Sequence, residues 1–243
     1  MGNRSVFVVV ALAVAVGFAG CDWVLGVHKF PPADAACSVI PGPPVGLVQQ
    51  ATAGSAAART LDGNLSCPPM MGDVLVIAGA AVNNELDKPT GGGVTTWSSI
   101  DRSNQQANVE LWIGVVDTTP SAVEIACSMC TATEQMWMLI TEWSGLVNDN
   151  LVEAKQRSAG TGSGVATTAA VSTLHAPDLL IFGVSTTANS ATDIPGWTAL
   201  DVVKEDVITQ YAWYQLTSTP GDYAASVAVT GRWDAVLGAV RAK

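Results

Sequence analysis

The sequence predicts an all-β protein, and three observations carry that prediction. Short segments such as 109–115 and 136–141 alternate between two faces with the period of two that strands require. Their many Val and Thr residues disfavour helix, and Gly, Pro and Asn turn signals separate them. An approximate internal repeat divides the body into halves of about 47–145 and 151–243. We therefore expect an antiparallel, jelly-roll-like β-sandwich of about ten strands built from two similar halves.

The N-terminal residues 1–20 have the layout of a secretory signal peptide. Arg4 is the only charged residue among them, and residues 6–18 form an apolar run. As a helix this run would be about 20 Å long, shorter than the roughly 30 Å hydrocarbon core of a bilayer. We therefore expect export rather than a permanent transmembrane helix.

The apolar run ends in Phe18-Ala19-Gly20-Cys21, with small residues directly before a cysteine. This pattern resembles the lipobox of bacterial lipoproteins. The resemblance covers only residues 1–21 and implies cleavage after Gly20, acylation of Cys21 and attachment to a lipid bilayer through the acyl chains. It implies a protein anchored to the bacterial cell envelope, in either the inner or the outer membrane.

Residues 21–45 are rich in proline and are expected to form an extended spacer between the anchor and the body. Without Cys21, an even number of cysteines remains, which predicts two disulfides in an oxidising compartment. These cysteines are Cys37, Cys67, Cys127 and Cys130. In a straight strand, Cys127 and Cys130 would point to opposite faces, so we expect them to bond separately to the other two. A redox dithiol or half of a zinc site is the alternative for this CxxC pair.

The chain is acidic, with 21 Asp and Glu residues against 11 Lys and Arg residues. Nucleic acid is therefore not an expected partner, because its binding depends on a cationic surface. The carboxylates are scattered along the sequence, which favours a role in solubility over cation binding. We expect neither a metal site nor a cofactor.

Five matches in the same order define the internal repeat. The matched pairs are Leu47-Val48 with Leu151-Val152, 72–77 with 177–182, Trp97 with Trp197, 111–113 with 212–214, and 136–143 with 233–240. Runs 74–82 and 179–184 are apolar on both faces, which predicts strands covered on both sides. A period of about 100 residues fits a duplicated half-sandwich or two similar modules. The short junction 146–150 favours one sandwich over 46–243, and two small sandwiches in tandem are the alternative.

The first half ends in Thr141-Glu142-Trp143-Ser144-Gly145-Leu146, and a Gly-, Ser- and Thr-rich stretch then leads to Ala176-Pro177-Asp178-Leu179-Leu180. This succession resembles repetitive β-sandwich modules of secreted bacterial proteins, over about residues 45–243. The resemblance implies no activity and no functional residue.

Few residues are candidates for catalysis. His175 is the only histidine of the body, and no GxSxG nucleophile motif is present, so we expect His175 to be an ordinary loop residue. Glu142 continues the face formed by alternate residues of 136–140, which predicts a carboxylate at a buried strand end. The alternatives for Glu142 are a polar anchor in a ligand cleft, or one acid of a glycan-active hydrolase.

Tryptophan is frequent, with eight residues beside four Phe and three Tyr. Trp97 and Trp197 lie next to Gly-rich or Pro-containing loops, where exposed rings would stack on the apolar faces of sugars. The simpler interpretation is that repeated tryptophans are repeated core residues. The sequence therefore predicts a non-catalytic interaction or structural module displayed by its lipid anchor, with a glycan or an envelope protein as partner. A carbohydrate-binding module is the alternative.

Overall fold

The computed structural model describes residues 45–131, 134–162, 164–187, 191–204 and 208–243. The predicted signal peptide, Cys21, Cys37 and nearly all of the predicted spacer lie outside the described residues. The described part is all-β, with eighteen strands in antiparallel sheets and no helix, so the predicted fold class is confirmed. It accordingly contains no helical segment of the length and apolar character that crossing a bilayer requires.

The first half of the body folds into one large and one small sheet. Its strands are β1 (Gly46–Ser55), β2 (Thr60–Gly63), β3 (Val74–Ala81), β4 (Thr90–Gly91), β5 (Ser98–Ser103), β6 (Val109–Val115), β7 (Val123–Ala126) and β8 (Met136–Ser144). The large sheet has the order β1-β8-β3-β6-β5, and the small sheet has the order β2-β7-β4. Every residue of the central strand β3 is buried, as its apolar sequence predicts.

The second half contains a second large sheet and two short ladders. Its strands are β9 (Val152–Gly160), β10 (Gly164–Thr167), β11 (Val171–Thr173), β12 (Asp178–Thr186), β13 (Thr198–Ala199), β14 (Val203–Lys204), β15 (Thr209–Leu216), β16 (Gly221–Tyr223), β17 (Ser226–Val229) and β18 (Trp233–Arg241). The large sheet has the order β9-β18-β12-β15-β13, with β14 also pairing with β15. The ladders pair β10 with β17 and β11 with β16.

The two large sheets have the same strand order. Strands β1, β8, β3, β6 and β5 of the first sheet take the positions that β9, β18, β12, β15 and β13 take in the second. The five sequence matches fall on or beside these equivalent strands. For example, Trp112 lies opposite Ile77 in the first sheet, and Trp213 lies opposite Phe182 in the second. The strand count exceeds the expected ten because the small outer sheets add strands of only two to four residues.

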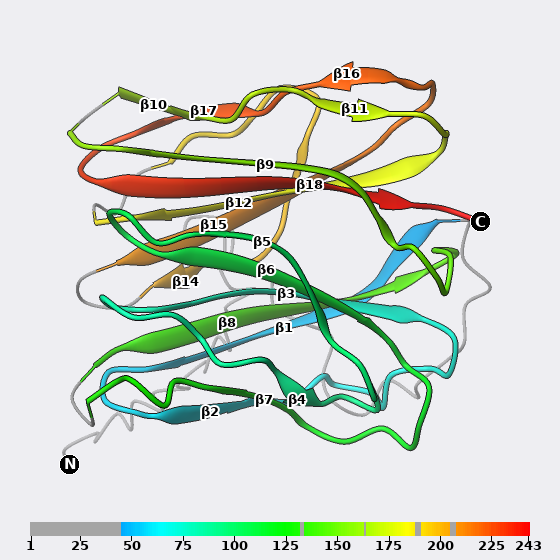
Figure 1. Ribbon diagram of the computed structural model, residues 1–243, viewed down its shortest axis with the longest axis horizontal. Coiled ribbons are helices and arrows are strands. Elements are labelled where there is room, and N and C mark those ends of the chain that lie inside the picture. Colours follow the sequence, from blue (N-terminus) through cyan, green and yellow to red (C-terminus); the bar gives the residue numbers. More distant parts are fainter. Residues whose placement is uncertain (1–44, 132–133, 163, 188–190, 205–207) are drawn as a thin grey trace, which may run out of the picture. The chain divides into compact units, whose positions relative to one another are not determined.

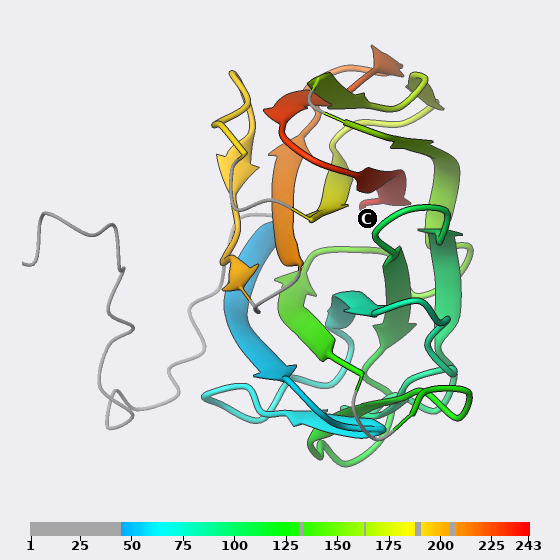
Figure 2. The same ribbon diagram turned by 90° about the vertical axis from the view of Figure 1, so that its left-hand side faces the viewer.

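The sheets are stacked in four layers (Figures 1 and 2). The two large sheets pack face to face, and the short strands of each half cover the outer face of that half's large sheet. Each of the three interfaces has a hydrophobic core. The central core contains Trp143, Ile181 and Val236, the first outer core Ile77, Ile125 and Ile140, and the second outer core Phe182, Val227 and Leu237. The body therefore has one shared core, and each half also forms a smaller sandwich of its own.

Strand β8 shows how the sequence pattern produces these layers. Met136, Met138 and Ile140 face the first outer core, whereas Trp137 and Leu139 face the central core. Successive side chains of a strand point to opposite faces, so a strand covered on both sides needs apolar residues at every position. The predicted alternation of this segment is confirmed.

A buried aspartate of the second half holds a turn of the first half. Asp234 lies on β18, is fully buried, and accepts hydrogen bonds from the turn between β5 and β6. Its donors are the hydroxyl of Ser103 and the backbone N–H groups of Gln105 (3.2 Å), Gln106 (2.7 Å), Ala107 and Asn108 (3.1 Å). Both carboxylate oxygens are therefore satisfied several times, which offsets the cost of burying the charge. We refer to this arrangement as the Asp234 clamp.

Candidate functional site

Trp97 is a core residue and not an exposed platform. It is 3% exposed and belongs to the first outer core. A Cβ added to Gly114 would lie 3.2 Å from its ring, and one added to Gly92 would lie 3.4 Å from it. The hypothesis that Trp97 stacks on a sugar is therefore wrong. The Gly-rich loop beside Trp97 packs closely against the ring instead of leaving it open to solvent.

Trp197 is half-buried in the second outer core. Its ring centroid lies 6.2 Å from that of Phe182. The other described tryptophans are buried, namely Trp112, Trp137, Trp143, Trp213 and Trp233. Among the described tryptophans, only Trp197 keeps part of its side chain exposed to solvent. This distribution agrees with the interpretation that repeated tryptophans are repeated core residues.

Glu142 is a fully buried carboxylate near the end of β8, as expected. One of its oxygens accepts a hydrogen bond from the backbone N–H of Met70 at 2.6 Å, and the other accepts one from Nε2 of Gln49 at 2.5 Å. Burial, followed by the charge and hydrogen bond of Glu142, raises the pKa of Asp73 to about 6. We refer to these residues as the Asp73–Glu142 pair. Both oxygens of Glu142 have a donor, so this acid fixes the loop at Met70 to the sheet.

The second half has an acid pair in a related place. Asp178 begins β12, much as Asp73 directly precedes β3. The glutamate beside Asp178 is Glu153 of β9, whereas the glutamate beside Asp73 is Glu142 of β8. Glu153 lies at the point where the pairing of β9 with β18 shifts by one residue. Its Oε1 accepts a hydrogen bond from the N–H of Leu174 at 2.9 Å and lies 2.7 Å from Nδ1 of His175. The turn before β12 therefore brings a histidine to the two acids.

The two acids have opposite pKa shifts. Burial, followed by the hydrogen bond with Glu153, raises the pKa of Asp178 to about 6. Burial would raise the pKa of Glu153 as well, but hydrogen bonds from Asp178, Leu174 and His175 outweigh it and lower that pKa. Asp178 is therefore the member of the pair that retains a proton more readily.

Apart from the hydrogen bond between the two acids, one oxygen of each acid lacks a donor. Asp178 is 0% exposed, and its Oδ1 accepts the N–H of Ala242 at 3.3 Å, but no described residue donates to its Oδ2. The side chain of Glu153 is 7% exposed, and its Oε2 likewise has no donor among the described residues. Ligand atoms of Glu153, His175 and Asp178 all lie within 4.8 Å of one another. We refer to these three residues as the acid–histidine cluster.

The sequence did not indicate this cluster. His175 lies in a turn, as expected, and its side chain is 52% exposed. Glu153 is 22 residues away from it, however, and no spacing motif connects the two. One feature of the sequence pointed to part of this cluster: Asp73 matches Asp178 in the internal repeat, which places an acid at the start of the central strand of each half.

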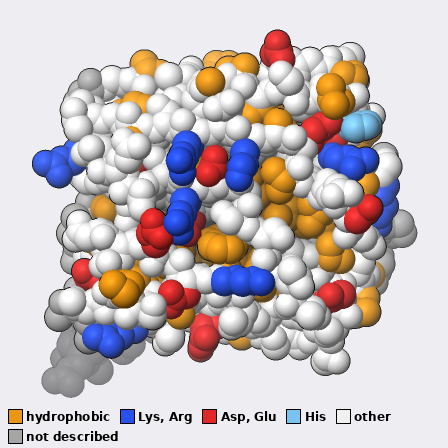
Figure 3. Space-filling view, viewed as in Figure 1, with side chains coloured by type: hydrophobic (Ala, Val, Ile, Leu, Met, Phe, Trp, Pro, Cys, Tyr) orange, Lys and Arg blue, Asp and Glu red, His pale blue; other side chains and the backbone are white. Residues whose placement is uncertain are grey.

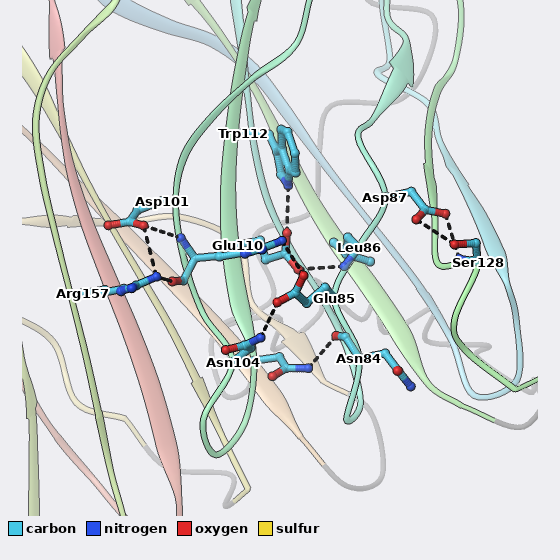
Figure 4. Close-up of polar contacts among 12 residues, drawn as sticks. Asn84, Glu85, Leu86, Asp87, Asp101, Asn104, Glu110, Trp112, Ser128 and Arg157 are labelled. Carbon is cyan, nitrogen blue, oxygen red and sulfur yellow. Dashed lines mark hydrogen bonds and ion pairs between the residues drawn. The ribbon is translucent and has the colours of Figure 1, made fainter.

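Figure 4 shows another buried acid, Glu110 of β6. It accepts hydrogen bonds from the N–H of Leu86 at 2.7 Å and from Nε1 of Trp112 at 3.3 Å. Burial raises the pKa of Glu110 to about 7, although both hydrogen bonds lower it. The alternating pattern placed Glu110 on the face opposite Val109 and Leu111, but it gave no sign that the loop at Leu86 covers that face.

Exposed charges beside Glu110 connect the two halves (Figure 4). Arg102 pairs with Glu85 at 2.6 Å, and Asn104 donates to the same carboxylate at 2.6 Å. Arg157 of β9 donates to the backbone oxygen of Arg102 at 2.9 Å and lies 3.7 Å from Asp101. Such solvent-exposed pairs each contribute about 1 kcal/mol or less to stability. The contacts of Arg157 link the edge strands β5 and β9, whereas those of Glu85 stay within the first half.

Cys127 and Cys130 form a disulfide with each other, so the prediction that they bond to different partners is wrong. Strand β7 ends at Ala126, and the N–H of Cys130 donates to the oxygen of Cys127 at 3.2 Å. A turn brings residues three apart together, whereas a straight strand would separate them, and the two Cα atoms are 5.2 Å apart. Cys67 is also disulfide-bonded, and the remaining cysteines lie outside the described residues.

The face shown in Figure 3 is mixed in charge, and two hollows lie on the surface of the described residues. Figure 3 shows basic and acidic side chains interspersed on one face, in agreement with the scattered carboxylates of the sequence. One hollow of about 200 Å³ is lined by residues 63–69 and 120–123. A second, of about 480 Å³, is lined by residues of β5 and β6 and by 148–152 at the junction of the halves. Glu142 lines neither of these hollows.

In comparisons with known proteins, no family model matches the sequence, and no curated protein and no solved structure is significantly similar to it.

Proposed function

We propose that the chain is a lipoprotein of the bacterial cell envelope, exported by residues 1–20 and anchored by acylated Cys21, whose β-sandwich body is a non-catalytic interaction or structural module. The signal layout and the lipobox pattern support the export and the anchor. The first described strand begins at Gly46. Residues 21–45 would therefore separate the body from the membrane by at most about 90 Å of extended chain.

The proposal that the body is an interaction or structural module rests on its buried carboxylates, which hold loops in place. Asp234 holds the turn between β5 and β6, Glu142 holds the loop at Met70, and Glu110 holds the loop at Leu86. A carboxylate that accepts backbone N–H groups inside the body fixes a loop and is withdrawn from solvent. These acids therefore support a rigid body that presents its outer loops, which is the property a displayed module needs.

The anchor is tested by metabolic labelling with a fatty-acid analogue in cells that express the full chain. We expect label on the wild-type protein in the membrane fraction and none on Cys21→Ser, because serine has no thiol to acylate. Cys67→Ser is the matched control, since it removes another cysteine and leaves the lipobox intact, and it should stay labelled. Label on the Cys21→Ser variant would contradict the anchor.

The non-catalytic assignment is tested by incubating the wild-type chain and Glu142→Gln with a panel of bacterial envelope glycans. We expect no hydrolysis product from either protein. A product formed by the wild type and lost in Glu142→Gln would make Glu142 an acid of a hydrolase and would refute the assignment.

A further inference from the structure

We propose that the acid–histidine cluster binds one divalent transition-metal ion, with Glu153, His175 and Asp178 as its ligands and zinc as the best-matched metal. This proposal goes beyond the envelope module and departs from the sequence-based expectation that no metal is bound. It rests on the positions of the three side chains and on the two carboxylate oxygens that lack donors.

The unpartnered oxygens call for a positive group between the acids. Oδ2 of Asp178 and Oε2 of Glu153 are buried, and apart from the contact between the two acids themselves no hydrogen-bond donor of a described residue reaches them. A buried polar atom without a partner costs about 1–3 kcal/mol, and a buried charge costs more. Two acceptors in contact can both be satisfied only by a shared proton or by a cation. A divalent cation would satisfy both oxygens and neutralise both charges.

The geometry fits a metal ion after a small adjustment. The three ligand atoms lie within 4.8 Å of one another, whereas ligands of zinc at bond lengths of about 2.0–2.2 Å lie about 3.3 Å apart. His175 can supply this adjustment, because it lies in a turn and its side chain is half-exposed. The same exposure gives an ion access from solvent and leaves room for a water ligand. The two acids are held by the backbone N–H groups of Leu174 and Ala242, so they form a fixed base.

The ligand set selects the class of metal. Calcium and magnesium prefer sites made entirely of oxygen atoms, whereas an imidazole nitrogen suits zinc and its neighbours in the first transition row. One imidazole and two carboxylates match the nitrogen and oxygen ligands that zinc takes in proteins. Three protein ligands leave a fourth position for water, so the site would be open rather than closed.

The first half of the chain supplies an internal control. Met70 stands three residues before Asp73, as His175 stands three residues before Asp178. The first half therefore offers two acids at the start of its central strand but no imidazole. Both oxygens of Glu142 also accept hydrogen bonds from protein donors. We expect the Asp73–Glu142 pair to bind no zinc.

The test is isothermal titration of the full chain with zinc chloride, using protein without a histidine tag and with intact disulfides. We expect one tight zinc site, with no competition from millimolar calcium or magnesium. Glu153→Gln and Asp178→Asn should each weaken binding by about 100-fold or more, because loss of a ligand exceeds the 10–100-fold cost of losing an outer-shell partner. His175→Asn should weaken zinc binding as well, and because the His175 side chain is half-exposed this variant should keep the wild-type fold.

Asp73→Asn and Glu142→Gln are the matched controls, and both should keep wild-type zinc affinity. Circular dichroism verifies that each variant is folded. Glu153→Gln should fold well, because the amide of the new glutamine can donate a hydrogen bond to Asp178. Absence of zinc binding by the wild type would overturn the proposal and leave a shared proton between the acids. Zinc binding that survives both Glu153→Gln and Asp178→Asn would place the metal elsewhere and would overturn it too.

Discussion

Glu110 shows how a covering loop changes the chemistry of a single side chain. The carboxyl group is fully buried beneath the loop at Leu86 and receives one backbone and one indole hydrogen bond. Two hydrogen bonds favour the ionised form, but loss of hydration opposes it more strongly, and the pKa rises to about 7. The protonation state of Glu110 therefore changes near neutral pH, which makes the stability of the fold depend on pH.

Glu110→Gln should flatten this dependence. The pKa of Glu110 is higher in the folded chain than its ordinary value of 4.5, so the folded state binds more protons between about pH 4.5 and pH 7. This contribution is complete below about pH 4.5 and is lost as the pH rises through 7, with a total of about 3 kcal/mol. Urea unfolding from pH 4.5 to 8 should show a smaller decline for the variant. The exposed control Asp149→Asn should follow the wild type, and an unchanged slope in Glu110→Gln would contradict the assignment.

Asp234→Ala should be among the most destabilising substitutions in the chain. It would remove the acceptor of five donors, and each buried donor without a partner costs about 1–3 kcal/mol before relaxation. We expect the free energy of unfolding to fall by at least about 3 kcal/mol in urea titrations. Asp234→Asn keeps one carbonyl oxygen as an acceptor, so its free energy of unfolding should lie between those of the wild type and Asp234→Ala. A loss no greater than that of the exposed control Asp149→Ala would show that the clamp is not needed.

At the scale of single elements, the end of β7 decides the cysteine pairing. Because the strand stops at Ala126, the next residues form a turn, and the disulfide closes that turn. Peptide mapping without reduction should yield a peptide in which Cys127 and Cys130 are bonded to each other. The double variant Cys127→Ser and Cys130→Ser should lose only about 2 kcal/mol of stability, because the closed loop is short. A peptide that joins Cys127 or Cys130 to Cys67 would refute the pairing.

The sequence predicted the strands themselves, but it did not predict where each strand ends or which loops and short strands pack over the sheets. Alternation in 136–141 correctly assigned Met136 and Trp137 to opposite faces, because side-chain direction in a strand depends only on local geometry. The pairing of Cys127 with Cys130 depended on where β7 ends, and strand ends are weakly encoded. The burial of Trp97 and Glu110 depended on short strands and loops that pack over the sheets, which are tertiary contacts without a local signal.

At the scale of the whole molecule, the halves are coupled through glycines of the second large sheet. A Cβ added to Gly238 would lie 2.6 Å from Ile100, and one added to Gly183 would lie 3.1 Å from Leu111. These glycines let strands of one half approach side chains of the other half closely. The internal repeat predicted that the halves resemble each other, but repetition alone could not predict that they share a core.

Gly238→Val should test this coupling. The larger side chain would collide with Ile100, and overpacking of this kind costs about 1–3 kcal/mol. Because both halves depend on the central core, we expect a single unfolding transition, shifted equally in tryptophan fluorescence and circular dichroism. Gly164→Val is the control, since a Cβ there would meet nothing within 4 Å. Separate transitions for the two halves would contradict a shared core.

The Asp234 clamp also sets an order of assembly. Its acceptor lies on the last of the described strands, whereas its donors lie 126 to 131 residues earlier in the chain. Strands β5 and β6 can pair once they have emerged from the ribosome. The N–H groups of the turn between them, however, have no acceptor until β18 has been synthesised and has packed against them. Contacts of such long sequence separation form late and slow the folding of β proteins. The first half is synthesised first, but the turn between β5 and β6 is therefore fixed only after β18 of the second half has been synthesised.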